Sequence, residues 1–549
     1  MYLPLLFVVG FIFGGQKFDS NKLEIAKRGD EYRIWVFFTD KNNSSLHRIT
    51  KRAEIRRNKV KNTEKSNWKD LNVSDEYTHR LKRLGFNILN ESRWLNAVTI
   101  NCQINDFKIL KALPFVKKIE PVNSAKKKLY EELSGPKETN RTFLYGDSQN
   151  QMEQINAINA HSLGYYGQGV RILYIDTGFD LSHEVFDSIR VINQYDFINN
   201  DSITSNETEE EFQNNQDEHG SICLSVLSGF KEGQLIGPAI KSEYLLAKTE
   251  IVDQEIQQEE DNYIAALEWG ESLGADIACA SLGYLDWYNY EDLDGNTAQT
   301  TIAVDIASSL GVLCVNSAGN SGDDDWYYII TPADADSILS VGSVDANGII
   351  SSFSSHGPTY DGRIKPEICA MGSSTFCIRP GTDSEYRYAS GTSLSAPLAA
   401  GAAAIVLSAN LQWSGMKVRQ AIMETASMAE LPNNDYGYGI INVINAIEYD
   451  PQLQLNEPGL SLPIDFNLSI FPNPFNPSTR IQLSGEKIDF LELNIFNLNG
   501  VLIKNISKNN FLENSFSFDW TPRKIGSGVY FIRVDAGNTI IHKKVIYIK

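Results

Sequence analysis

The feature that most constrains this chain is a heptapeptide followed by a run of small residues. Residues 391–397 read Gly-Thr-Ser-Leu-Ser-Ala-Pro, and residues 398–404 are only Leu, Ala and Gly. A helix of such small side chains can be buried and closely packed against its neighbours. Ser393 falls at the expected start of this helix, where backbone N–H groups lack helical partners and the helix dipole is positive. A serine there lies in a field that favours negative charge on its oxygen, although a capped core helix fits the same pattern.

Three other polar residues accompany Ser393 in a fixed chain order. Asp176 ends an apolar run before a glycine turn, His219 opens an apolar helical pattern, and Asn320 lies in a glycine-rich loop behind another apolar run. In open α/β sheets, functional groups gather at the carboxyl ends of the strands. Taken singly, Asp176 can cap a turn, His219 can be structural and Asn320 can be a turn residue.

Together these segments resemble the motifs of the subtilases, the serine peptidases of the subtilisin type. Four motifs match in order, namely IDTG at 175–178, HGS at 219–221, SAGN at 317–320 and GTSLSAP at 391–397. The segment ASLG at 280–283 resembles the substrate-binding strand of that family. The resemblance implies an α/β fold, a subtilisin-like parallel sheet with helices on both faces.

The resemblance also implies a role for each motif residue. Ser393 would be the nucleophile, His219 its general base, and Asp176 the group that orients the imidazole. Asn320 and the Ser393 N–H would bind the oxyanion. The substrate would lie along three residues, Ser281, Leu282 and Gly283. An esterase of the α/β-hydrolase type runs Ser, acid, His and needs G-x-S-x-G, so that class does not fit.

Charge is unevenly distributed along the chain. Residues 21–130 carry 25 Lys+Arg and 12 Asp+Glu, a net charge of +13, whereas residues 146–549 carry 21 and 53, a net charge of −32. A basic block can bind nucleic acid, but beside an acidic catalytic domain it is better explained as an inhibitory propeptide attracted to that domain. Alternating patterns predict a small α+β (ferredoxin-like) domain, with strands at 32–38, 97–100 and 116–120 and helices at 76–84 and 107–113.

The two ends of the sequence predict export. Residues 2–13 form an apolar run that is too short to span a bilayer as a mature helix and resembles a signal peptide. No other stretch is apolar and long enough for a membrane span. From Ser469 onward, short alternating runs and an Asn499-Gly500 turn predict an Ig-like β-sandwich. The PNPFNPST segment at 472–479, with the terminal Lys549, resembles the sorting domain read by the type IX secretion machinery.

Cysteines and acidic residues leave two questions open. Cys369 and Cys377 are the one plausible disulfide pair, with free buried thiols as the alternative. Cys223 lies one helical turn after His219 and is interpreted as packing. Asp292 and Asp294 resemble the start of a calcium loop, but the full EF-hand pattern is absent and an ordinary turn fits as well. The chemistry is expected to need no cofactor, with a structural calcium compatible with the family.

The sequence therefore predicts a secreted or cell-surface serine endopeptidase made as an autoprocessed zymogen, exported through the periplasm and outer membrane. Its partners would be polypeptide substrates, its own propeptide and the secretion machinery, with no nucleic acid. The alternative is a catalytically inactive surface-binding protein on a protease fold. The expected parts are a signal peptide (1–15), a propeptide (28–123), a linker with the processing site (124–150), the catalytic domain (151–450), a linker (451–467) and the sorting domain (468–549).

Overall fold

The computed structural model describes most of the chain. The described residues are 27–28, 31–60, 68–122, 124–126, 145–252, 257–285, 288–449, 467–471, 475–484, 490–497, 502–509, 515–522, 525–526, 528–536 and 539–547. The chain forms two compact units, Met1–Tyr449 and Asp450–Lys549. The expected signal peptide, residues 451–466 of the second expected linker and the Asn499-Gly500 turn lie outside the described residues.

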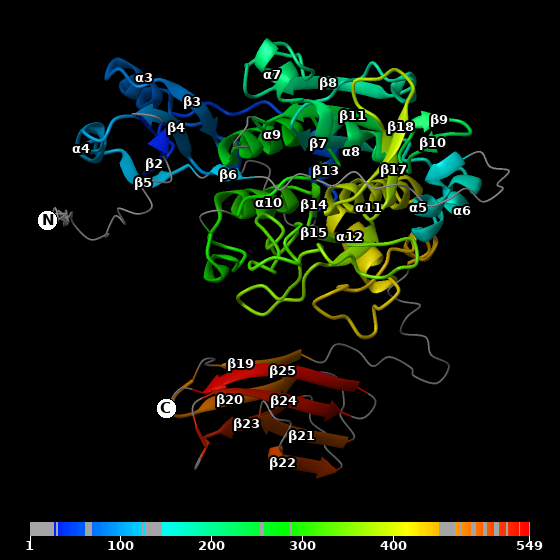
Figure 1. The fold of residues 1–549 in the computed structure, drawn as a ribbon. Coiled ribbons are helices and arrows are strands. Elements are labelled where there is room, and N and C mark those ends of the chain that lie inside the picture. Colours follow the sequence, from blue (N-terminus) through cyan, green and yellow to red (C-terminus); the bar gives the residue numbers. More distant parts are fainter. Residues whose placement is uncertain are drawn as a thin grey trace, which may run out of the picture. The chain divides into compact units, whose positions relative to one another are not determined.

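The first unit begins with a small antiparallel sheet and its helices, the N-terminal domain (Figure 1). Strand β2 pairs with β1, β4 and β5, and β4 also pairs with β3. Alternate residues of β2 serve two cores: Ile34, Val36 and Phe38 face the domain's own helices, whereas Trp35 and Phe37 pack against the rest of the unit. The elements are β1 (Lys27–Arg28), β2 (Glu31–Phe38), α2 (Lys51–Arg57), η1 (Trp68–Asp70), α3 (Asp75–Arg83), β3 (Ile88–Ser92), β4 (Ala97–Cys102), α4 (Asp106–Lys111) and β5 (Val116–Pro121).

The five elements expected in this domain are confirmed, each within two residues of its expected ends. Helix α2 and strand β3 were not expected. Helix α2 has no apolar stripe, because its buried residues are Ala53, Arg56 and Arg57. Both arginines contact the carboxylate of Glu271, which is more than 200 positions away in the sequence. A local pattern therefore could not show that this helix has a buried face.

The centre of the first unit is a seven-stranded sheet in the order β16-β15-β14-β13-β7-β11-β8, as expected for the α/β fold. Every neighbouring pair is parallel. Such strands are covered on both faces and carry nearly continuous apolar sequence. The strands are β7 (Arg171–Asp176), β8 (Arg190–Asp196), β11 (Glu243–Lys248), β13 (Ile277–Ala280), β14 (Leu313–Ser317), β15 (Leu339–Val344) and β16 (Ile368–Met371).

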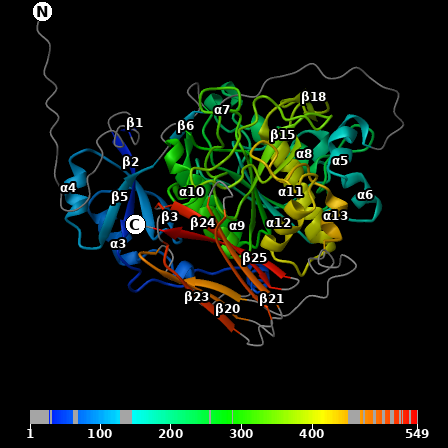
Figure 2. The same cartoon turned by 90° about the horizontal axis from the view of Figure 1, so that it is seen from below.

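Helices cover both faces of this sheet (Figure 2). On β7, Ile172 and Tyr174 join the core that contains α8 and α11, whereas Leu173 and Ile175 join the core that contains α9 and α10. The helices are α5 (Gln149–Gln154), α6 (Ala157–Ser162), α7 (Glu209–Gln213), α8 (Glu218–Ser228), α9 (Glu260–Ser272), α10 (Gln299–Ser309), α11 (Thr392–Ala409), α12 (Gly415–Glu424) and α13 (Val443–Ile447), with short 3-10 turns η2 (Gly146–Ser148), η3 (Glu184–Phe186) and η4 (Tyr290–Asp292).

Helix α11 is the heptapeptide and small-residue run of the sequence, and it lies in the core as expected. Its small side chains allow close approach: a Cβ on Gly401 would overlap the ring of Pro238. In the part of the chain that the structure describes, α11 is the one helix long and apolar enough to cross a membrane, and 94% of that window is buried inside the protein. Its apolar character therefore serves packing against the sheet.

The first expected linker contains regular structure at both ends of its range, and its residues 127–144 lie outside the described residues. Ser124–Lys126 forms β6, which pairs antiparallel with β12 (Gln257–Glu259) just before α9, and α5 begins at Gln149. Two further small pairings lie at the edge of the unit. They are β9 (Phe230–Lys231) with β10 (Leu235–Ile236), and β17 (Thr375–Ile378) with β18 (Tyr386–Ala389).

The second unit contains two antiparallel sheets, which supports the expected β-rich domain. One has the order β19-β20-β23 and the other β22-β21-β24-β25. A single apolar core contains residues from both sheets, among them Ile481, Trp520 and Ile532. The Ig-like topology stays a prediction. The strands are β19 (Asn467–Phe471), β20 (Thr479–Ser484), β21 (Phe490–Asn497), β22 (Leu502–Asn509), β23 (Ser515–Trp520), β24 (Gly528–Ala536) and β25 (Thr539–Tyr547).

Candidate active site

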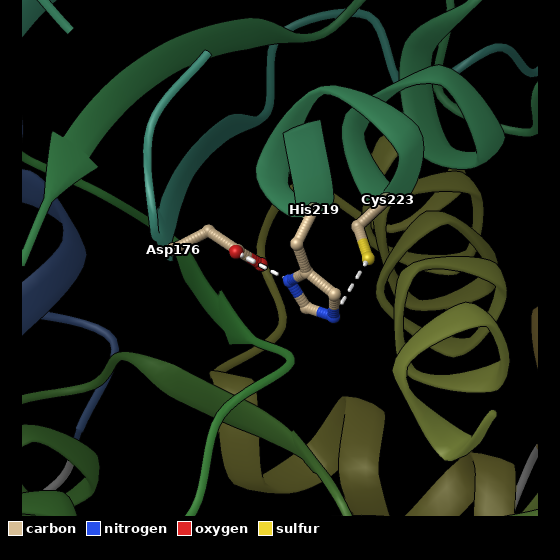
Figure 3. A group of neighbouring side chains, drawn as sticks. All are labelled: Asp176, His219 and Cys223. Atoms are coloured by element: carbon tan, nitrogen blue, oxygen red, sulfur yellow. Dashed lines mark hydrogen bonds and ion pairs between the residues drawn. The ribbon is translucent and has the colours of Figure 1, made fainter. Parts of the chain in front are cut away.

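Asp176 and His219 form a buried pair at the carboxyl end of the sheet (Figure 3). Asp176 is the last residue of β7, and His219 is in the first turn of α8. His219 Nδ1 lies 2.6 Å from Asp176 Oδ1, whose carboxylate is fully buried and also accepts the Thr177 N–H at 2.8 Å. The helix can come this close because residue 220 is glycine, since a Cβ there would overlap the Gly178 carbonyl oxygen.

The other ring nitrogen of His219 faces a thiol. Cys223 Sγ lies 3.7 Å from His219 Nε2, one helical turn along α8 (Figure 3). Asp176, His219 and Cys223 each offer a metal-ligating atom within 4.8 Å of one another. The sequence interpretation, packing with no ligand set nearby, missed this proximity. A Cys four residues after a His was its only sequence signal.

Ser393 is bound to the strand next to Asp176. Strands β7 and β13 are paired with Ile175 opposite Ala280, so Ser281 follows β13 beside Asp176. Ser281 Oγ donates to the Ser393 carbonyl at 2.8 Å, and Ser393 Oγ donates to the Ser281 carbonyl at 3.4 Å. The sheet register thus brings the Ser393 and Asp176 segments together.

Pro397 explains why the Ser393 carbonyl can accept that bond. In an α-helix, the carbonyl of residue 393 would accept from the N–H of residue 397. Proline has no N–H, so this hydrogen bond cannot form. Ser281 Oγ supplies one instead, and its own oxygen lies 3.1 Å from the Tyr174 hydroxyl. The proline was visible in the sequence motif, but its partner could not be read from it.

Asn320 is oriented by the residue before Ser393. Its Oδ1 accepts both the N–H and the hydroxyl of Thr392 at 2.9 Å, which fixes the plane of the carboxamide. A Cβ on Gly391 would lie 3.5 Å from Asn320 Nδ2 and 3.7 Å from the Ser393 nitrogen. Both nitrogens therefore border one small space, which the absence of a side chain at residue 391 leaves open.

The segment after β13 contains the three predicted substrate-binding residues. Ser281 contacts Ser393, and the Leu282 carbonyl accepts from the Asn316 side chain at 2.7 Å. Gly283 is followed by Tyr284, whose N–H donates to the Thr331 carbonyl at 2.8 Å. The structure thus brings Asp176, His219, Ser393, Asn320 and residues 281–283 into one region.

The predicted calcium residues are elsewhere and already have partners. Asp292 accepts the Asn289 N–H and closes η4, and Asp294 accepts the Asn296 N–H in a turn. Neither belongs to a group of three candidate ligands among the described residues. These contacts are those of the ordinary turn that the sequence left open as the alternative.

A second acidic group lies beside a buried lysine. Carboxylate oxygens of Asp196, Asp201 and Glu207 lie within 4.8 Å of one another. Lys248 Nζ is 2.9 Å from Asp196 Oδ2 and also contacts Glu211. The ammonium group therefore supplies positive charge to the one buried carboxylate of this group.

The question of the cysteine pair is answered by the structure. Cys369 on β16 and Cys377 on β17 are both buried free thiols. Cys369 Sγ contacts the Tyr436 carbonyl at 3.6 Å, and Cys377 Sγ contacts the Arg387 carbonyl at 3.5 Å. Burial raises the pKa of the Cys377 thiol to about 12, so it stays protonated at neutral pH.

Comparison with known proteins matches this arrangement. The model of the Subtilase family matches residues 167–439, and subtilisin E of Bacillus subtilis (strain 168) is 30% identical over 295 residues, which is 53% of this chain and 69% of the relative. The chain belongs to the subtilase family. Subtilisin DY of Bacillus licheniformis is 29% identical over 290 residues, 53% of this chain and 94% of the relative. This protein is accordingly a subtilisin-like serine endopeptidase.

The two flanking domains also match known families. A Bacteroidota propeptide domain of the same peptidase family matches residues 33–136, and a secretion-system C-terminal sorting domain matches residues 469–549. The subtilase is therefore a secreted or cell-surface serine peptidase with a propeptide, and the sorting domain indicates type IX secretion.

The propeptide is bound to α9 by buried ion pairs, in agreement with the expected charge attraction. Glu271 on α9 accepts from Arg56, from Arg57 at 2.8 Å and from Arg93 at 3.2 Å. Arg93 also lies 3.0 Å from Glu268, whose carboxylate accepts two backbone N–H groups of the propeptide. Buried charges of this kind are tolerated only when they are fully paired.

Opposing effects act on the Glu271 carboxyl. Burial raises its pKa, but the hydrogen bond from Arg57 and the nearby arginine charges outweigh burial, so the pKa lies below its usual value of 4.5. A carboxyl whose folded-state pKa is lowered stabilises the folded state above its unfolded pKa. That stabilisation is lost as the pH falls below about 4.5 toward the folded-state pKa.

We expect Glu271→Ala to lower the free energy of unfolding of the intact chain by about 3–5 kcal/mol at pH 7, because it leaves buried arginines without their partner. Urea unfolding measures this, with both variants made in a Ser393→Ala background that is expected to keep the chain at full length. The control is Glu385→Ala in the exposed Arg379–Glu385 pair, which should cost less than about 1 kcal/mol. Equal losses in the two variants, or a Glu271 effect that persists unchanged well below pH 4.5, would contradict this interpretation.

Proposed function

We propose that Asp176, His219 and Ser393 form the catalytic triad of this subtilase, which is synthesised as a zymogen and cleaves itself. The observation that carries the proposal is the buried 2.6 Å contact between His219 Nδ1 and Asp176 Oδ1, beside a serine bound to the neighbouring strand. Its support is the agreement of this geometry with the Asp, His, Ser chain order of the family motifs.

In the proposed mechanism the Ser393 hydroxyl attacks the carbonyl carbon of the substrate. A serine hydroxyl is a weak nucleophile until a base removes its proton, and His219 Nε2 is the base. Asp176 accepts the Nδ1–H, so that Nε2 carries the lone pair, and it stabilises the imidazolium that forms. The imidazolium then protonates the leaving amine, and water repeats the sequence to release the acyl group.

The developing oxyanion would be bound in the space beside Gly391. Asn320 Nδ2 and the Ser393 N–H border that space, and the positive end of the α11 dipole points to it. Such preorganised donors act on charge that appears only in the transition state. Thr392, which holds the Asn320 amide, would be a positioning residue.

The substrate would bind in extended form along Ser281, Leu282 and Gly283, with its backbone adding a strand. The propeptide offers an analogy in this chain: its β6 pairs antiparallel with β12. Strand β12 follows the segment in which the Thr249 N–H donates to the Asp176 carbonyl. This supports a propeptide that inhibits by occupying the edge of the active site, with self-cleavage between Lys126 and Gln151.

Export would run through the periplasm and the outer membrane, with the sorting domain as the signal and the secretion machinery as partner. A structural calcium stays a prediction, and the chemistry proposed above uses only side chains and backbone groups of the chain. The alternative of an inactive binding protein finds no support in the family match, and the four motif residues needed for catalysis are all present.

We expect wild-type protein to lose its propeptide and to hydrolyse casein, whereas Ser393→Ala stays at full length and is inactive. Intact mass and casein hydrolysis measure the two outcomes. Ser395→Ala is the matched control, because its buried hydroxyl donates to the Thr392 carbonyl within α11. If Ser393→Ala behaves as wild type, Ser393 is not the nucleophile and the binding-protein alternative takes first place.

We also expect Gly391→Ala to reduce kcat by about two orders of magnitude, because the new methyl group would fill the space between the two oxyanion donors. KM should change far less, since the effect falls on the transition state. Steady-state kinetics on a peptide substrate measure both constants. A proportional rise in KM with unchanged kcat would place this space in ground-state binding instead.

A further inference from the structure

A substrate side chain must enter between two segments of the proposed site. This inference rests on the proposed function. The residue whose carbonyl is attacked, the P1 residue, has its backbone along Ser281–Gly283 and its carbonyl oxygen at Asn320. These two segments follow β13 and β14, which are neighbours in the sheet, with Ala280 opposite Asn316. The P1 side chain therefore projects into the gap between Gly283 and Gly319.

Ile330 closes the floor of that gap. Its N–H donates to the Ala318 carbonyl at 3.1 Å, and the next residue, Thr331, accepts from the Tyr284 N–H at 2.8 Å. The Ile330 backbone thus bridges the loop of Asn320 and the segment of Gly283. Both hydrogen bonds fix the position of its side chain relative to the two walls.

The side chain of Ile330 fills the space that the two glycines leave. Its Cδ1 and Cγ1 stand where a Cβ on Gly283 would be, with Cγ1 at 2.6 Å. The same two atoms are 3.3 and 3.2 Å from the position of a Cβ on Gly319. Ile330 is only half-buried, unlike its neighbour Ile329, which belongs to the core. Ile330 therefore keeps some surface that is accessible to solvent.

We propose that Ile330 is a specificity-determining residue that restricts P1 to small side chains, namely glycine, alanine and serine. A phenylalanine, leucine or lysine side chain at P1 would have to occupy volume that Ile330 already takes. Forcing additional methylene groups into a filled site costs about 1–3 kcal/mol. That cost corresponds to a discrimination of about 5- to 150-fold between P1 residues.

The loop after Asn320 also contains an acidic run and two tyrosines. The run Asp323–Asp325 lies in an exposed turn, in which the Asp324 N–H donates to the Ser321 carbonyl. The Tyr327 ring stacks on His356, and the Tyr328 ring stacks on Tyr290. Neither a basic nor an aromatic P1 preference therefore follows from this loop.

The test uses the mature enzyme, produced from the full-length chain. Its substrates are tetrapeptide anilides that differ only at P1, which is alanine, phenylalanine or lysine. We expect wild type to have a kcat/KM for alanine at least tenfold above that for phenylalanine or lysine. Ile330→Gly should shift the phenylalanine-to-alanine ratio by at least tenfold toward phenylalanine, and Ile330→Val should give an intermediate ratio. The ratio is the readout because a merely structural role would lower both rates together.

Ile350→Gly is the matched control, since Ile350 is also half-buried but its N–H donates to the Tyr436 hydroxyl, outside the region of the proposed site. It should leave the ratio unchanged. A wild-type preference for phenylalanine or lysine, or the same ratio in wild type, Ile330→Val and Ile330→Gly, overturns the inference.

A fluorophosphonate label on Ser393 separates this inference from the proposed function. Wild type that neither labels nor cuts any of the peptides contradicts the proposed function itself. Wild type that labels and cuts without preferring alanine contradicts only the role of Ile330. If Ile330→Gly does not label because it fails to fold, the wild-type series and Ile330→Val decide the outcome, and an unchanged ratio in Ile330→Val is then the contradicting result.

Discussion

The geometry of the site depends on the Ser393 carbonyl, which lacks its usual hydrogen-bond donor within the helix. Pro397 removes the N–H that would bind the Ser393 carbonyl, and Ser281 Oγ donates to it instead. This hydrogen bond ties the start of α11 to the strand beside Asp176, and the packing of an Ala- and Gly-rich helix makes that approach possible. The relative positions of α11, β13 and β7 at the site thus depend on small side chains and a proline within one sequence motif.

Two other features support the structure: close backbone approach at the site itself, and buried charge at the propeptide interface farther away. Around the site, glycines at 220 and 391 leave room for the Asp176–His219 pair and for the space between Asn320 Nδ2 and the Ser393 N–H. Further out, the propeptide is held on α9 through arginines that reach two buried glutamates. An interface of this kind needs complete pairing, because removing one partner leaves an uncompensated charge in a poorly solvated place. It therefore couples the stability of the zymogen to a few named residues.

The sequence predicted those elements of the fold that leave a local pattern of residues. Apolar runs predicted the strands that end at Asp176 and before Asn320, and the small-residue run predicted the buried helix of Ser393. Contacts between segments that are far apart in the sequence could not be predicted from such patterns. Helix α2 was missed because its buried face is arginine, and β6 because its partner strand is more than 100 residues away. The side chain of Ile330 lies against two glycines in segments that follow different strands, a relation that only the folded chain reveals.

The central claim is that Ser393 is a nucleophile activated by His219 and Asp176. The most direct measurement is to label native protein with a fluorophosphonate and to locate the adduct by peptide mass spectrometry, in wild type and in His219→Ala. The account predicts an adduct on Ser393 in wild type and a labelling rate lower by orders of magnitude without the imidazole. An adduct on another residue, or equal labelling of Ser393 in both proteins, would contradict it.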